Sequence, residues 1–201
     1  MPEMSERLLD LAQEFIQTRG YNAFSYRDLA DATGITTASI HYHFRTKSDL
    51  GQAVVVRYRE GLIARLAQID STVPSCINRL RHFTDLFVAT LERNFQMCLC
   101  GMLAAEQRTL PPELNREVVG FFSVTETWLT HTLREGIRRG EIADIGPVPR
   151  FARIVLATLE GAMLVARVTG DHSRLTEVIS AIKSDIRKPV AARSASIEAA
   201  N

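Results

Sequence analysis

The sequence SYRDLADATGITTASIHYHFRTKSDL, residues 25–50, decides the fold of this chain. It predicts two short helices joined by a glycine turn, with another helix beginning just beyond. Ser25 is a favourable N-cap, and Asp28 three residues later completes a capping box. Gly34 ends the first helix, because glycine takes the left-handed conformation at little cost. The second helix is polar and lacks carboxylates, as is typical of a helix-turn-helix that places this helix in the DNA major groove.

The same stretch resembles a known family. Residues 34–50, GITTASIHYHFRTKSDL, are similar to the signature of TetR-family transcriptional regulators, and residues 12–34 resemble the rest of that family's DNA-binding domain. The resemblance covers roughly residues 5–55, and the remaining chain shows a compatible helical plan. Thr37 stands where the family frequently has lysine, and His41 where it usually has tyrosine. Both positions are expected to face DNA, so the operator sequence of relatives does not transfer to this chain.

The resemblance also implies which residues contact DNA. Tyr42, His43 and Lys47 occupy positions expected at phosphates or sugars, and Thr37 and His41 occupy positions expected at base edges. Short hydroxyl residues permit close approach, and a helix N-terminus favours an anion. The expected DNA-binding residues are Arg27, Thr36, Thr37, Ser39, His41, Tyr42, His43, Thr46 and Lys47. Phe44 and Ile40 are expected to pack inward, and Thr46 with Asp49 predicts a second capping box.

Two other interpretations of the run from His41 to His43 stay open, a solvated helix face and a metal site. Residues two apart point to different sides of a helix, which disfavours a shared metal ion. We therefore expect no metal and no cofactor, and we expect DNA contact.

The charge of the chain is nearly balanced. Its formal net charge is +1, and residues 1–50 carry five basic and seven acidic side chains, a net charge of −2. A protein that bound DNA by bulk electrostatics would be basic. The positive groups of this domain gather around Arg27, Arg45 and Lys47, so few phosphates are neutralised per subunit. Operator affinity should therefore fall only moderately as salt is raised, and a very steep slope in salt titrations would contradict this.

Length and composition predict a globular chain of two domains. The 201 residues are 46% hydrophobic, enough for one small and one larger core. We predict a helix-turn-helix DNA-binding domain over residues 1–50, a helical effector-binding and dimerisation domain over 51–190, and a flexible tail over 191–201. The charged start MPEMSERLLD and the lack of a long apolar run predict a cytoplasmic protein without a membrane span. Three cysteines disfavour a disulfide framework.

The hydrophobic pattern is helical throughout, which predicts an all-α fold. Leu8, Ala12, Phe15 and Ile16 form the stripe of a first helix that ends before Gly20. Further helices are expected over about 47–69, 75–95, 99–107, 112–139, 151–168 and 175–186. The N-terminal three-helix domain would thus be followed by a larger helical domain.

The segment FARIVLATLEGAMLVARV, residues 151–168, is apolar on more than one side. Such a helix is either the centre of the larger domain or a dimer contact. The family resemblance implies dimerisation through the last two helices as a four-helix bundle. A homodimer also suits DNA, because two recognition helices must reach half-sites about one helical turn apart.

The resemblance further implies an effector pocket in the larger domain. Its candidate lining residues are Phe83, Phe87, Met102, Phe121, Phe122, Thr125 and Trp128. Apolar walls would suit a hydrophobic effector, although aromatic and methionine side chains at helical spacing more often form a plain core. Glu106 and Arg108 are either polar anchors in this pocket or solvated surface.

Residues 98–106, CLCGMLAAE, resemble a pattern in those relatives that sense electrophiles or oxidants. Cys98 matches the sensing position, and a cysteine near a helix N-terminus can have a lowered pKa. The alternative is that each cysteine is a small buried hydrophobe.

The leading hypothesis is a homodimeric repressor that a small hydrophobic or electrophilic effector releases from a palindromic operator. A thiol sensor acting through Cys98, a helical-cavity enzyme and a helical interaction module are the alternatives. GxSxG, HExxH and phosphate-binding glycine loops are absent from the sequence, so we do not expect an enzyme.

Overall fold

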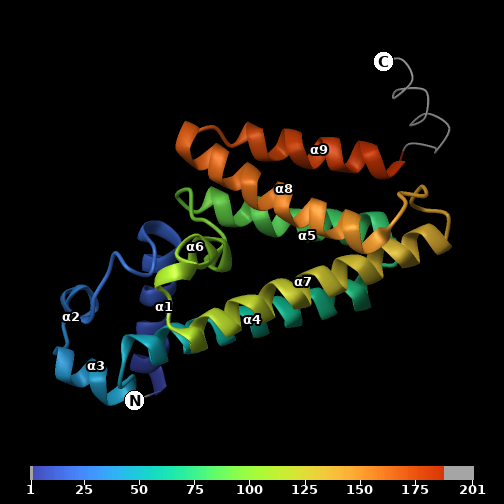
Figure 1. The fold of residues 1–201 in the computed structure, drawn as a ribbon. Coiled ribbons are helices and arrows are strands. Elements are labelled where there is room, and N and C mark those ends of the chain that lie inside the picture. Colours follow the sequence, from blue (N-terminus) through green and yellow to red (C-terminus); the bar gives the residue numbers. More distant parts are fainter. Residues whose placement is uncertain (1, 188–201) are drawn as a thin grey trace. The chain divides into compact units, whose positions relative to one another are not determined.

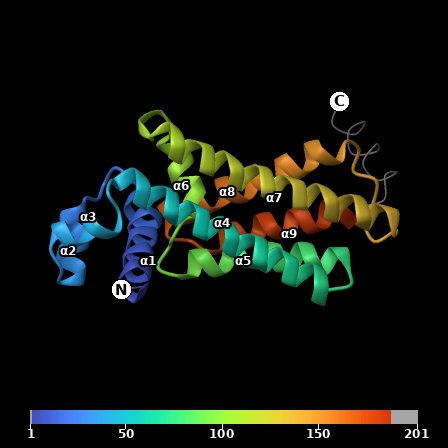
Figure 2. The same ribbon diagram turned by 90° about the horizontal axis from the view of Figure 1, so that it is seen from below.

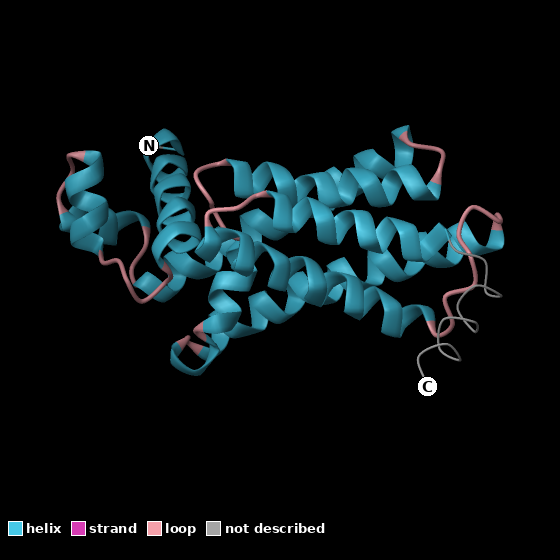
Figure 3. Ribbon diagram, turned by 90° about the horizontal axis from the view of Figure 1, so that it is seen from above, coloured by secondary structure: helices cyan, strands magenta, loops and turns pink. Residues whose placement is uncertain are grey.

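The computed structural model describes residues 2–187, and over that range it contains helices and no β-strand (Figure 3). The helices are α1 (Pro2–Arg19), α2 (Tyr26–Thr33), α3 (Thr37–His43), α4 (Lys47–Thr72), α5 (Cys76–Glu92), α6 (Leu99–Ala105), η1 (Gln107–Thr109, a 3-10 turn), α7 (Pro112–Arg138), α8 (Val148–Thr169) and α9 (Ser173–Arg187). The predicted all-α fold is confirmed. The tail predicted over residues 191–201 lies outside the described residues.

The chain forms two compact units. The first consists of the residues up to Ala64 together with Phe95–Ser123, and the second of Arg65–Asn94 together with the chain from Val124. The boundary predicted at residue 50 falls inside α4, which is one continuous helix. That domain boundary stays a prediction.

In the first unit, α1 is the helix against which others pack. Its predicted stripe of Leu8, Ala12, Phe15 and Ile16 is buried. α2 and α6 both contact α1, and α3 packs on α2 (Figure 1). α1 therefore links α2 to α6, a helix that begins about 55 residues after α3 ends.

In the second unit, α8 and α9 run side by side and α5 packs against both (Figure 2). α8 buries Leu156, Leu159 and Met163, as its apolar sequence predicts. It ends at Gly170, whose φ of 66° is left-handed. This C-cap glycine allows the chain to reverse directly into α9.

The helix predicted over residues 75–95 ends earlier than expected. α5 stops at Glu92, and Asn94 and Phe95 have φ values of 55° and 54°. Left-handed backbone is rare for residues other than glycine and interrupts a helix. No glycine or proline marks this break, which explains why the hydrophobic pattern missed it.

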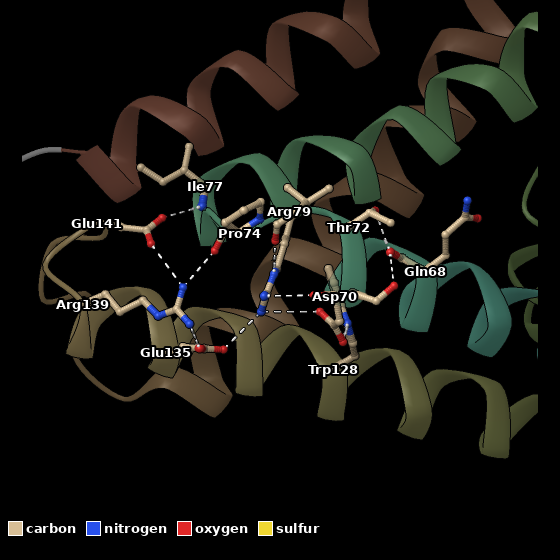
Figure 4. A network of polar contacts seen from close by, with 12 residues as sticks. Gln68, Asp70, Thr72, Pro74, Ile77, Arg79, Trp128, Glu135, Arg139 and Glu141 are labelled. Atoms are coloured by element: carbon tan, nitrogen blue, oxygen red, sulfur yellow. Dashed lines mark hydrogen bonds and ion pairs between the residues drawn. The ribbon is translucent and has the colours of Figure 1, made fainter.

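A polar network joins α4, α5 and α7 within the second unit (Figure 4). The buried Arg79 guanidinium donates from Nε to the Val73 carbonyl at 2.7 Å and from Nη2 to the Asp70 carbonyl at 3.1 Å. It also forms an ion pair with Glu135 at 3.2 Å. Arg79 thus donates to half-buried carbonyl groups at the end of α4, where the helix supplies no further N–H groups.

Candidate nucleic-acid interface

α2 is capped at both ends by the residues that the sequence predicts. The Ser25 backbone N–H and hydroxyl donate to Asp28 Oδ2 at 2.7 and 2.6 Å, and the capping box is present. These hydrogen bonds hold the pKa of Asp28 below its ordinary value. Gly34 has a left-handed φ of 74°, and its N–H donates to the Ala30 carbonyl at 2.8 Å. A side chain would be strained at this φ, so the turn into α3 depends on glycine.

α3 presents a polar face without carboxylates. Its N-cap Thr36 accepts a hydrogen bond from the Ser39 N–H at 3.2 Å. Ile40 is fully buried, which confirms that it packs inward, and Phe44 is half-buried. Tyr42 is 74% exposed, so nearly its whole ring is available to a partner.

The nine expected DNA-binding residues lie on α2, on α3 and at the junction between α3 and α4. Two of them, His43 and Lys47, are half-buried. The exposed ones are Arg27, Thr36, Thr37, Ser39, His41, Tyr42 and Thr46. At the junction, Thr46 and Asp49 form the predicted second capping box, with N–H to side-chain oxygen distances of 2.9 and 3.1 Å.

His41 is held from two sides. Its Nδ1 lies 2.9 Å from the Arg45 carbonyl oxygen, and its ring meets the Tyr26 ring edge-on at 4.7 Å between centroids. A carbonyl oxygen can only accept, so Nδ1 carries the hydrogen. In the neutral imidazole, Nε2 is then an acceptor.

Tyr26 holds the end of α3, a role that the sequence pattern did not reveal. Its hydroxyl donates to the Phe44 carbonyl at 2.9 Å, and burial raises its pKa, so the hydroxyl remains a donor. Tyr26 therefore fixes the C-terminal end of α3 while its ring supports His41. An aromatic residue at the first position of α2 was the available signal.

Lys47 makes its contacts within the chain. Its ammonium donates to the Tyr21 carbonyl at 2.6 Å and to the Phe24 carbonyl, and it lies 4.5 and 4.3 Å from the centroids of the Tyr21 and Phe24 rings. Burial lowers its pKa. A phosphate contact by Lys47 stays a prediction. The structure gives this side chain another role, tying the α1–α2 turn to the start of α4.

The effector candidates divide between the two units. Met102, Phe121 and Phe122 belong to the first, and Phe83, Phe87, Thr125 and Trp128 to the second. Within the second unit, the Phe83 ring lies 5.3 Å from Phe87 and 5.4 Å from Trp128, between centroids. The Trp128 indole N–H donates to Asp70 at 2.9 Å. Their role in binding an effector stays a prediction.

A small recess also lies in the second unit, apart from most of those candidates. Apolar side chains of α5, α7, α8 and α9 line it, with Thr84 and Lys183 as its polar residues. Its free volume of about 20 Å³ for water-sized molecules is on the scale of a single water. It offers no room for an effector as it stands.

The two candidate polar anchors differ in their surroundings. Arg108 is exposed. Glu106 accepts hydrogen bonds from the Tyr21 and Asn22 backbone N–H groups at 2.7 and 3.2 Å. Its carboxylate therefore binds the α1–α2 turn, an assignment that the sequence pattern did not reveal.

All three cysteines are buried. Cys98 is the N-cap of α6 and is 4% exposed, while Cys76 and Cys100 are fully buried. Burial also raises the pKa of Cys76, which lowers the thiolate fraction. This burial favours a packing role over direct reaction with a bulky electrophile.

We expect none of the three thiols to react with an aromatic disulfide reagent while the protein is folded. Reagent absorbance should report fewer than one thiol per chain in native buffer and three in urea, because only unfolding exposes them. Rapid reaction of one thiol in native buffer, abolished by Cys98→Ser, would restore the sensing hypothesis.

Within residues 2–187, no three His, Cys, Asp or Glu side chains cluster in a way that would hold a metal ion. Among the described helices, none combines the length and apolar character needed to cross a bilayer.

Comparison with known proteins decides the family. The model for bacterial regulatory proteins of the tetR family matches residues 8–54, and the model for the tetracyclin repressor-like C-terminal domain matches residues 76–182. The chain belongs to the TetR family of transcriptional regulators. The second match alone spans more than half of the 201 residues.

Individual TetR-family relatives agree with this. A TetR-family regulator from Agrobacterium tumefaciens superposes with a TM-score of 0.89 at 32% identity, over 92% of this chain and 98% of that one. A TetR regulator from Legionella pneumophila gives 0.84 at 34% identity, over 90% and 96%. The transcriptional repressor KstR2 from Mycolicibacterium smegmatis is 34% identical over 87 residues, 43% of this chain. That match spans 41% of the KstR2 chain.

Proposed function

We propose that this TetR-family protein is a homodimeric repressor that binds a palindromic operator through α3 and is released by a small hydrophobic effector. The observation that carries the proposal is the exposed, carboxylate-free face of α3, held by a capping box and a left-handed glycine. The similarity to KstR2, which is named a transcriptional repressor, favours repression over activation.

The exposed side chains of α3 suit close contact with DNA. Thr37 and His41 are four residues apart and therefore share one helix face. Because Nδ1 is hydrogen-bonded to the Arg45 carbonyl, His41 would present Nε2 to a base edge. In the neutral ring, Nε2 can accept a hydrogen bond from the amino group of adenine or cytosine. Tyr42 would reach a phosphate or sugar, and contacts of that kind position the protein without reading sequence.

The homodimer is supported by the surface of α8. Ile154, Leu164, Val165 and Val168 are large apolar side chains that are 50, 54, 46 and 83% exposed. Their spacing of ten, one and three residues places them along one side of the helix. A cluster of exposed apolar residues on one helix marks an interaction surface, and a two-fold symmetric pair would cover it.

The effector would act by population shift. A ligand that prefers a conformation with unsuitable recognition-helix spacing lowers operator affinity by its differential binding to the two states. The aromatic candidates Phe83, Phe87 and Trp128 favour a hydrophobic or aromatic ligand. A thermal-shift screen of such compounds, followed by operator release, tests this part of the proposal.

Tyr42→Ala tests the DNA contact. We expect operator affinity to fall about tenfold while the order of preference among altered operators is unchanged, because Tyr42 contacts backbone rather than base. The side chain is exposed, so the thermal midpoint should stay within about a degree or two of the wild type. Fluorescence anisotropy with the operator and three single-base variants measures both quantities. Unchanged affinity for all four duplexes would contradict a role for Tyr42.

A further inference from the structure

The α1–α2 turn, residues 20–24, is held by charged side chains from outside it on both sides. Glu106, just after α6, accepts from the Tyr21 N–H at 2.7 Å and from the Asn22 N–H at 3.2 Å through Oε2. Lys47, the first residue of α4, donates to the carbonyls of Tyr21 and Phe24. All of these residues belong to the first unit. The Glu106 carboxylate accepts hydrogen bonds from backbone N–H groups of the turn, and the Lys47 ammonium donates hydrogen bonds to its carbonyl groups.

Gly20 makes this approach possible. Its φ is 96°, and a Cβ built there would lie 2.6 Å from Glu106 Oε1. A side chain at this position would therefore displace the carboxylate as well as strain the backbone. A second hydrogen bond joins the same two segments of the chain. The side-chain amide of Asn22 donates to the Thr109 hydroxyl of η1 at 2.7 Å. The segment from α6 to η1 is thus hydrogen-bonded to two adjacent residues of the turn, Tyr21 and Asn22.

Beyond the turn lie the elements that present DNA-facing side chains. Phe24 is followed directly by the α2 N-cap, and Lys47 follows α3 at the start of α4. A displacement of the turn therefore moves the entry to α2 and the Lys47 anchor together. Hydrogen bonds to a charged group are shorter and stronger than neutral ones, so these contacts hold the turn firmly in place.

We propose that Glu106 is a positioning residue for operator binding, which holds the helix-turn-helix in its DNA-competent geometry by capping the α1–α2 turn from α6. This inference rests on the proposed function, because it supposes an operator.

The test combines amide exchange with operator binding in full-length Glu106→Ala, Glu106→Gln and the control Glu113→Gln. Glu113 is half exposed and pairs only with Arg116, at 3.9 Å, among the interactions described for it. In Glu106→Ala, the Tyr21 and Asn22 amides should exchange roughly tenfold faster and operator Kd should rise roughly tenfold, the scale of one charge-assisted hydrogen bond. Glu106→Gln keeps an acceptor oxygen and should recover part of both losses. Glu113→Gln should match the wild type.

Two results would overturn the proposal. One is wild-type operator affinity in Glu106→Ala despite faster exchange at Tyr21 and Asn22, and the other is unchanged exchange at these amides. If Glu106→Ala does not fold, Glu106→Gln alone decides, and wild-type values for both readouts would overturn the proposal. Failure of the wild type to bind any operator would count against the proposed function instead, while exchange still reports the cap.

Discussion

Arg79→Met is expected to lower the free energy of unfolding by about 3 kcal/mol, the lower end of what removing one partner of a buried ion pair costs. The Arg79 side chain is 11% exposed, and its loss leaves the Val73 and Asp70 carbonyls and the Glu135 carboxylate without this donor. Methionine retains the apolar stem, so the change isolates the guanidinium. The lower end applies because the Glu135 carboxylate keeps its ion pair with Arg139 when Arg79 is replaced. Urea unfolding at one fixed protein concentration measures the effect, since the proposed dimer would make stability concentration-dependent.

Arg138→Met is the matched control. Arg138 also pairs with Glu135, at 3.9 Å, but its side chain is 74% exposed. An exposed pair contributes little, so the unfolding free energy should change by less than about 0.5 kcal/mol. Equal urea midpoints for the two variants would show that the buried network in Figure 4 does not stabilise the second unit.

The double variant Leu164→Asp with Val168→Asp is expected to be monomeric and to bind the operator at least about 100-fold more weakly. Both side chains are exposed on α8, so each subunit should still fold. Two carboxylates on the apolar surface would oppose pairing, and a monomer loses the gain from engaging two half-sites at once. Sedimentation velocity gives the oligomeric state, and anisotropy gives the affinity.

Val119→Asp controls for adding a carboxylate to an exposed valine elsewhere. Val119 lies on α7 and is 60% exposed. The Val119→Asp variant should keep both the wild-type oligomeric state and the wild-type operator affinity. A dimeric double variant with wild-type operator affinity would exclude this face of α8 as the subunit interface.

Local features of the helix-turn-helix were predictable because short-range chemistry determines them. The Ser25 and Thr46 capping boxes involve residues three apart, and the Gly34 turn needs only one residue with a left-handed φ. The burial of Ile40 follows from helical periodicity in the same way. Such features require no knowledge of the rest of the chain.

Contacts between distant residues were not predictable from these patterns. Glu106 meets Tyr21 across 85 positions, and Lys47 meets Tyr21 across 26. A glutamate after a short helix and a lysine at a helix start are ordinary surface residues by sequence, and only tertiary packing brings them to the turn. The left-handed pair Asn94 and Phe95 was missed because no glycine or proline marks it and phenylalanine rarely adopts that conformation.

Operator binding by the wild-type protein is the direct test of DNA recognition through α3. Fluorescence anisotropy would be measured with DNA fragments from the region flanking the gene, against a shuffled fragment of equal length, at one stated salt concentration. We predict that at least one fragment binds at least about 1,000-fold more tightly than the shuffled one, as specific recognition does, with two subunits per palindromic site. Equal, weak binding of every fragment by the folded, dimeric protein would contradict the account.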